Sequence, residues 1–323
     1  MARLDLNRVF NRGKTKMSYR CPLLVLVALF SWASLCLHAE ETKLRVMTIN
    51  ILHGGVRLGQ PLSQTAKVIR EAKADLVGMQ ECLDGSRDSA AEVAKQLGWH
   101  YLYQGNRTAI LSRHEIVGHT PGKTGAHIKL PNGTVLHLFN VHFPASPYQP
   151  YQLAMIPYGA FPYIKTAKEA VHWANIGRGQ NMGRLLNELI MSLEQGIPCF
   201  VTGDFNEPSF QDWTDRSVKS GAIPLAVAWP ATTRLVQAGM QDGYRTIYSN
   251  EIKNRGWTWT PTTKPTDPQD RHDRIDFVFG SKKTTRPVQA AVVGENNQNA
   301  NIVVSPWPTD HRAVVVEFKI GVQ

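Results

Sequence analysis

Six short apolar runs, spread along most of this chain, are each bordered by polar residues that can bind a cation or move a proton. Each run is short and rich in β-branched and aromatic residues, which is typical of a buried β-strand. The bordering residues are Asn50, Glu81, His142, Asp204 with Asn206, Asp276, and the pair Asp310 and His311. Rigid strand ends can hold such groups around one point. The pattern therefore predicts one polar site where several strands of a sheet end.

These residue types match the chemistry of metal-assisted phosphoester hydrolysis. That reaction needs an activated water, stabilisation of charge on the phosphoryl oxygens, and a proton for the leaving group. Carboxylate and amide oxygens are the ligands that Mg²⁺ or Mn²⁺ prefers. A histidine held by a carboxylate can donate or accept a proton near neutral pH. The constellation therefore indicates a divalent-metal-dependent phosphoric ester hydrolase.

In this order, the motifs resemble those of the endonuclease/exonuclease/phosphatase superfamily. The resemblance runs from about Leu44 to Phe318. It implies an α+β fold, a four-layer α/β sandwich in which two mixed or antiparallel β-sheets pack face to face with helices outside. Members share the reaction centre and differ in their loops, so the substrate class stays open. Nucleic acid, a phospholipid head group and an inositol phosphate all fit, for a nuclease, a phosphodiesterase or a phosphatase.

The resemblance implies a metal-binding set at one side of the site. Asn50, Glu81 and Asp310 match its ligands, for Mg²⁺ or Mn²⁺. Arg107 and His53 are candidates for contact with the substrate phosphate. Structural roles are the alternatives to metal binding, since Asn50 could cap a turn and Glu81 could be a surface charge.

The resemblance also implies a catalytic set. Asp276 would hold one ring nitrogen of His311, whose other nitrogen would face the phosphate. Asp204 would orient or deprotonate the attacking water, and Asn206 would donate to a phosphoryl oxygen. Strand alternation places Asp204 and Asn206 on the same side. His142 matches a second histidine, although a histidine satisfied inside the core is the alternative.

The first 39 residues have the order of a secretory signal, with basic residues, an apolar run at 23–37 and a cleavage site near Ala39. A start at Met17 would give a more ordinary signal length, and a retained membrane anchor is the alternative. Residues 40–323 are then expected to form a single domain, secreted or periplasmic. The signal holds six of the 36 basic residues and one of the 26 acidic ones, which leaves a net charge of +5. That charge suits any phosphorylated substrate without demanding nucleic acid.

Residues 144–183 interrupt the pattern of strands and helices directly after His142. This aromatic-rich insertion carries four tyrosines, Phe161 and Trp173, with several prolines. Long loops in compact domains are usually functional or disordered, and aromatic content argues against disorder. The insertion is either a lid that shapes the substrate site or a self-packed cover of the sheet. A helix is expected only after it, over 184–193, where leucines recur at helical spacing.

Several further expectations complete the sequence-based interpretation. The protein is expected to be a monomer with no stable protein partner. Cys82 and Cys199 either form a disulfide or are buried thiols. Ser63 is a plausible N-cap for a helix ending at Ala72, and residues 257–260 are expected to form a strand. The alternative function is a catalytically inactive protein that binds a phosphate ligand on the same scaffold.

Overall fold

A computed structural model describes residues 42–321, which contain two large β-sheets. The seven-stranded sheet has the order β14 (Ile302–Val303), β13 (Thr285–Gly294), β15 (Ala313–Ile320), β1 (Thr42–Asn50), β2 (Leu76–Gln80), β6 (Thr108–Ser112) and β5 (His100–Gly105). The six-stranded sheet has the order β11 (Met240–Asp242), β12 (Asp276–Ser281), β10 (Cys199–Asp204), β9 (Val135–His142), β8 (Gly125–Lys129) and β7 (Glu115–His119). A small hairpin joins β3 (Leu83–Asp84) to β4 (Arg87–Asp88).

Both large sheets are mixed. The strands β1 and β2 run parallel, as do β9 and β10, while most other neighbours run antiparallel. Parallel neighbours end at the same edge of a sheet, so their last residues lie side by side. The end of β1 therefore lies beside that of β2, and the end of β9 beside that of β10. The two pairs meet because the sheets face each other, as the hydrogen bond from Asn50 of β1 to Asp204 of β10 shows.

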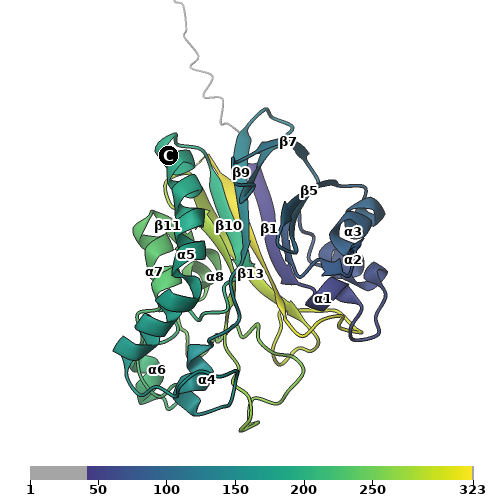
Figure 1. Ribbon diagram of the computed structural model, residues 1–323. Helices are drawn as coiled ribbons and strands as arrows, with labels where there is room; N and C mark the ends of the chain where they lie inside the picture. Colours follow the sequence, from purple (N-terminus) through teal and green to yellow (C-terminus); the bar gives the residue numbers. More distant parts are fainter. Residues whose placement is uncertain (1–41, 322–323) are drawn as a thin grey trace, which may run out of the picture. The chain divides into compact units, whose positions relative to one another are not determined.

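Helices cover the outer face of each sheet (Figure 1). The helices α2 (Leu62–Glu71) and α3 (Ser89–Leu97) pack on the seven-stranded sheet. The helices α5 (Ala167–Glu194) and α7 (Pro230–Gln237) pack on the six-stranded sheet. A third apolar layer lies between the two sheets. This order of helix, sheet, sheet and helix confirms the predicted four-layer sandwich. The shorter helices are α1 (Leu52–Gly55), α4 (Gln149–Ala154), α6 (Asp215–Lys219) and α8 (Gly243–Ile247).

Side chains along β15 point alternately to the two faces of the sheet, which explains why its sequence is a continuous apolar run. Val314, Val316 and Phe318 point between the sheets, whereas Ala313 and Val315 face the helices. Both faces of the strand are buried over residues 313–316, where no polar residue occurs, whereas Glu317 and Lys319 further along are only partly buried.

A polar cluster interrupts the apolar layer between the sheets. The Gln80 side-chain amide donates to Asn140 Oδ1 at 2.6 Å, and Asn140 Nδ2 donates to the Met79 carbonyl at 3.1 Å. Gly78 leaves the room for this contact, because a Cβ there would lie 2.0 Å from Thr202 Oγ1 and 2.4 Å from Asn140 Oδ1. The cluster fixes the two sheets against each other close to the strand ends.

The insertion at 144–183 is only partly a loop. The helix α5 begins at Ala167, where Thr166 forms a capping box with Glu169, so the expected start near residue 184 is wrong. Pro61, not Ser63, precedes α2, and no side chain caps that helix. Residues 257–260 form no strand and contribute only single bridges at Trp259.

Two other expectations concern redox state and membranes. Cys82 and Cys199 are buried and free, as the thiol alternative predicted. Over residues 42–321, no helix is both long and apolar enough to cross a bilayer. The secretory signal expected at 1–39 lies outside the described residues.

Candidate active site

A cavity of about 360 Å³ opens where the strands of both sheets end. Its lining contains seven of the ten site residues expected from the sequence, namely His53, Glu81, His142, Asp204, Asn206, Asp310 and His311. Asn50 and Asp276 are fully buried directly behind this lining, in contact with it. Arg107 borders an adjoining hollow that shares His53 with the cavity. The structure therefore brings all ten residues together.

Strand register places three of these residues in one row. On the six-stranded sheet, Asp204 of β10 pairs with His142 of β9 on one side and with Asp276 of β12 on the other. His311 precedes β15 on the opposite sheet, and its Nδ1 lies 2.9 Å from Asp276 Oδ2. The facing sheets thus supply the two halves of a histidine–carboxylate pair.

The pair of His311 and Asp276 is buried and holds a proton tightly. Burial lowers the pKa of the His311 ring, but the carboxylates of Asp276 and Asp204 outweigh it and raise that pKa to about 10. Burial also raises the pKa of Asp276, helped by repulsion from Asp204. The Nε2 atom of His311 lies 3.7 Å from Asp204 Oδ2, so the ring bridges the two carboxylates. A protonated imidazole in this position can act as a hydrogen-bond donor to an oxyanion in the cavity.

Asp204 is the centre of the arrangement. Its Oδ1 accepts from the Asn206 backbone amide at 2.9 Å, and its Oδ2 accepts from Asn50 Nδ2 at 3.0 Å. The strand β10 ends at Asp204, and Asn206 adopts a left-handed conformation with φ of 48°. The turn, rather than strand alternation, therefore puts both side chains on the cavity. Asn206 Nδ2 also donates to the Phe143 carbonyl at 3.0 Å, which orients its amide.

Asn50 links Asp204 to Glu81. Its Nδ2 donates to Glu81 Oε1 at 3.1 Å as well as to Asp204, while its Oδ1 accepts from the Leu52 amide at 3.0 Å. In this arrangement Asn50 acts as a hydrogen-bond donor to two carboxylates, and its side-chain oxygen is already occupied by the Leu52 amide. Burial acts to raise the pKa of Glu81, but the hydrogen bonds from Asn50 and from the His53 amide outweigh it and lower that pKa.

Basic side chains surround the other face of Glu81. His53 Nδ1 lies 3.2 Å and an Arg107 Nη2 lies 3.8 Å from Glu81 Oε2. His142 Nε2 lies 3.9 Å from Glu81 Oε1 and 3.6 Å from Asp204 Oδ2. His142 is partly exposed at the end of β9, so the reading of a satisfied core histidine does not fit its surroundings.

Two donor sets within residues 42–321 could hold a divalent cation. Glu81 and Asp310 both line the cavity; the pKa of Asp310 is raised, first by burial and further by repulsion from Glu81. Two carboxylates that repel each other across a polar cavity fit a cation between them. Asp204, Asp276 and His311 also lie close enough to share an ion. That second set fits less well, because a cation there would have to displace the proton that His311 holds between Asp276 and Asp204.

Aromatic residues form another wall of the cavity. Tyr148, Tyr151 and Tyr158, from the insertion, line the cavity together with Trp259. The Trp259 ring lies 4.9 Å from the His311 ring, and its Nε1 donates to the Tyr151 hydroxyl at 3.2 Å. Trp259 carries no motif signal in the sequence, since an expected strand at 257–260 gives no reason to place it here.

Two carboxylates, of which Asp273 is buried and Asp270 partly buried, hold this aromatic wall in position. The Tyr148 hydroxyl donates to Asp273 Oδ2 at 2.9 Å, and the Tyr151 hydroxyl donates to Asp270. Burial raises the pKa of Asp273 to about 6. Asp273 carried no motif signal, although its position three residues before Asp276 could have suggested a supporting role.

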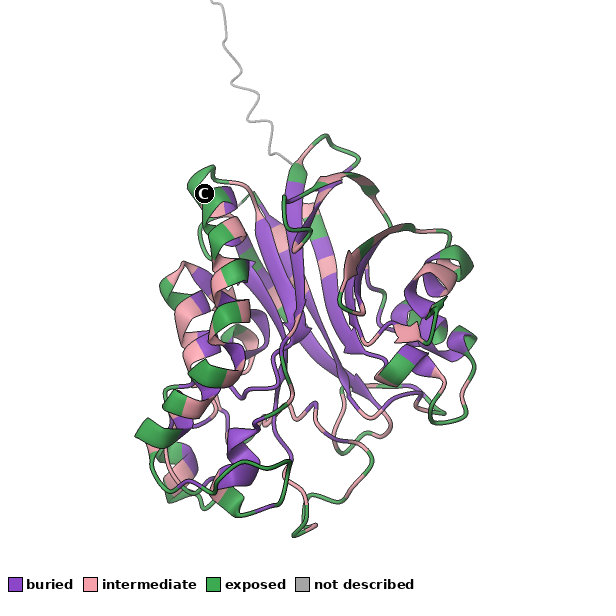
Figure 2. Ribbon diagram, viewed as in Figure 1, coloured by how far each residue is buried: buried purple, intermediate pink, exposed green. Residues whose placement is uncertain are grey.

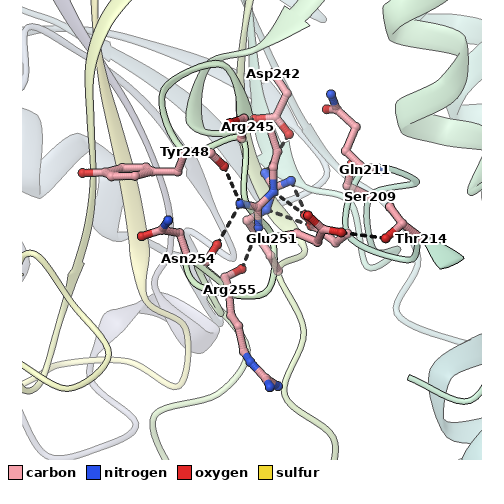
Figure 3. Close-up of polar contacts among 12 residues, drawn as sticks. Ser209, Gln211, Thr214, Asp242, Arg245, Tyr248, Glu251, Asn254 and Arg255 are labelled. Carbon is pink, nitrogen blue, oxygen red and sulfur yellow. Dashed lines mark hydrogen bonds and ion pairs between the residues drawn. The ribbon is translucent and has the colours of Figure 1, made fainter. Parts of the chain in front are cut away.

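An arginine network fixes the chain that leads into Trp259. Arg245 donates to the carbonyl oxygens of Asn254 at 2.7 Å and Arg255 at 3.1 Å, as Figure 3 shows. Its Nε pairs with Asp212 at 2.5 Å, and Asp212 also binds Arg274 at 2.9 Å. The loop before Thr258 is thereby tied to the segment before Asp276. Thr258 Oγ1 in turn accepts from the Asp276 amide at 3.1 Å.

Most of the sequence matches a known protein family. The sequence pattern of the Endonuclease/Exonuclease/phosphatase family matches residues 47–311. A protein of Caenorhabditis elegans, described as uncharacterized protein F14F9.5, is 27% identical over 303 residues, which cover 87% of this chain and 93% of that protein.

Solved structures share the fold at low sequence identity. An AP endonuclease from Archaeoglobus fulgidus is 16% identical with a TM-score of 0.53, covering 84% of this chain and 98% of its own. A variant of the 3′ phosphatase NExo from Neisseria, bound to a product DNA hairpin, is 16% identical with a TM-score of 0.54, covering 85% and 99%. At these identities the likeness concerns the fold alone.

Proposed function

The chain belongs to the endonuclease/exonuclease/phosphatase family, whose members are metal-dependent phosphoesterases, and from this premise we propose that it is a secreted, divalent-metal-dependent phosphoester hydrolase. One observation carries the proposal. The side chains of Asp276, His311, Asp204, Asn50 and Glu81 form an unbroken series of contacts of 3.7 Å or less across the cavity.

The series supplies the parts that phosphoester hydrolysis requires. Asp204 accepts hydrogen bonds and faces the cavity, so it is placed to orient a water and take its proton. His311, protonated and held by Asp276, would donate to a phosphoryl oxygen on which charge develops. His142, across Asp204 from Asp276, would donate from the other side.

The residues fit a divalent cation on the Glu81 side. We assign Glu81 and Asp310 as its charged ligands and Mg²⁺ or Mn²⁺ as its identity, because both ligands are hard oxygen donors. When bound there, the ion would neutralise charge on the phosphate. Asn50 would then orient Glu81, while Arg107 and His53 would contact the substrate at the rim.

A catalytically inactive binding protein is the less favoured alternative. A protein that has lost its activity usually keeps the scaffold but has other residues at the catalytic positions. Here every expected polar residue is present and lies in or beside the cavity. The proposal of secretion rests on the signal-like sequence at 1–39, and that of a monomer without a stable protein partner rests on the sequence interpretation alone.

An activity panel tests the proposal. The full chain would be assayed with Mg²⁺ or Mn²⁺ against plasmid DNA, a choline phospholipid, inositol phosphates and the minimal diester bis-p-nitrophenyl phosphate. We expect hydrolysis of at least one ester that stops with a chelator and returns with added metal. An Asp204→Asn variant, close to isosteric, is the control for a contaminating enzyme. Binding of phosphate esters without turnover would favour the inactive alternative.

A further inference from the structure

Apolar side chains gather on the outer surface of the insertion. Met155, Tyr158, Phe161 and Tyr163 are 67%, 43%, 37% and 51% exposed, and we call these four residues the aromatic edge. They account for four of the thirteen large exposed hydrophobic residues within 42–321, yet they lie within nine consecutive positions. Single exposed apolar residues are ordinary, but four on one short segment point to an interaction surface. Figure 2 shows the chain between α4 and α5 as largely exposed.

The aromatic edge is held outward by the fold. Ile156 and Ile164 of the same segment are buried, and the Gln152 side chain donates to the Pro162 carbonyl at 2.8 Å. The Phe161 ring packs edge-on against Trp173 at 5.9 Å. A segment fixed at these points presents its apolar side chains without paying much ordering entropy on binding.

Charge is absent from this segment and positive at its end. Residues 143–164 contain no Asp, Glu, Lys or Arg, and Lys165, Lys168 and Glu169 follow, which leaves one net positive charge at this end. A nucleic acid partner would require cations along the contact, and a specific protein partner would be matched by a polar rim. Tyrosine, phenylalanine and methionine without charge, flanked by lysine, instead match the interfacial region of a bilayer that carries anionic lipid.

The aromatic edge is continuous with the reaction cavity through Tyr158, which belongs to both. We propose that the aromatic edge docks the protein on a lipid surface, so that the cavity opens toward phosphoesters held in that surface. The substrate class is then a phospholipid head group, an inference that rests on the proposed function, whereas the docking itself does not.

A position-specific fluorescence experiment tests the docking. An environment-sensitive dye would be attached to Tyr163→Cys in the full chain, with Cys21→Ser and Cys36→Ser removing the other thiols, since Cys82 and Cys199 are buried. Met191→Cys is the matched control: Met191 is 59% exposed and lies near the far end of α5, the helix that follows the aromatic edge. Vesicles would contain phosphatidylcholine and phosphatidylserine.

We expect the emission at position 163 to shift to the blue with vesicles, with no shift at position 191. If the protein binds vesicles but the emission shifts at neither position, another part of the chain makes the contact, and the proposal is overturned. A shift at 163 that grows with protein concentration in the absence of vesicles would identify a second copy of the chain as the occupant, and would also overturn it.

An activity ratio links docking to substrate choice. The double variant Met155→Ser/Tyr163→Ser should lose about tenfold or more in hydrolysis of a vesicle-held phospholipid, while bis-p-nitrophenyl phosphate is cleaved at the wild-type rate. Equal loss on both substrates would contradict the inference. A blue shift at 163 with no hydrolysis of any ester would support docking and refute the proposed function.

Discussion

Replacing Asp276 with asparagine isolates the charge that holds His311. The substitution keeps the size of the side chain and an oxygen that can accept from His311 Nδ1, 2.9 Å away, but removes the buried negative charge. A ring pKa raised from 6.5 to about 10 corresponds to about 5 kcal/mol of preference for the protonated form. Asp276 and Asp204 share that effect, and breaking a buried pair typically costs about 3–5 kcal/mol. We therefore expect Asp276→Asn to lower the free energy of unfolding by about 3 kcal/mol at pH 6.

The pH dependence of that difference is the decisive part. Because the folded-state pKa of His311 lies above its unfolded value, its stabilising contribution is complete below about pH 6.5 and is lost as pH rises through about 10. The difference between wild type and Asp276→Asn should shrink over the same range. Urea unfolding from pH 6 to pH 10, with a chelator present, measures it. A difference that stays constant with pH would show a packing effect and refute the charge argument.

Three further substitutions test separate parts of the structure. Glu81→Ala should abolish metal-dependent turnover without changing the thermal midpoint by more than a few degrees; retained turnover at limiting Mg²⁺ would remove Glu81 from the metal site. His142→Ala should lower the rate on the true substrate by about 10², and a wild-type rate would return this histidine to a structural role. Gly78→Ala should lower the free energy of unfolding by about 3 kcal/mol or more, because the new Cβ would overlap Thr202 and Asn140; urea unfolding with an unchanged midpoint would contradict the tight contact between sheets.

The site residues could be predicted from the sequence because they lie at the ends of strands or directly beside them. The apolar runs before Asn50, His142 and Asp204 are buried on both faces, which makes each run continuous and its polar end conspicuous. The structure brings all ten expected residues together, while their individual roles stay predictions. The donor role of Asn50 was not visible, because the partner of an amide side chain depends on the backbone that follows it.

Features that depend on tertiary contacts could not be predicted from the sequence. The first half of α5 buries Ala170, Ala174 and Arg178, so small residues and an arginine replace the leucine pattern that signals a helix. Arg178 can be buried because it donates to Gln149 Oε1 and the Pro147 carbonyl, both at 2.8 Å, and so joins α5 to the start of the insertion. The position of Trp259 over His311 likewise follows from bridges to distant residues rather than from any local pattern.

Metal-dependent cleavage of bis-p-nitrophenyl phosphate by the purified chain is the simplest test of the proposed hydrolase activity. This minimal diester needs only the reaction centre, so the result does not depend on the natural substrate. We expect nitrophenolate release that requires Mg²⁺ or Mn²⁺, stops with a chelator, and falls by at least about 10² in Asp204→Asn. Release at an equal rate by wild type and Asp204→Asn, or none by a folded wild-type protein supplied with either metal, would contradict it.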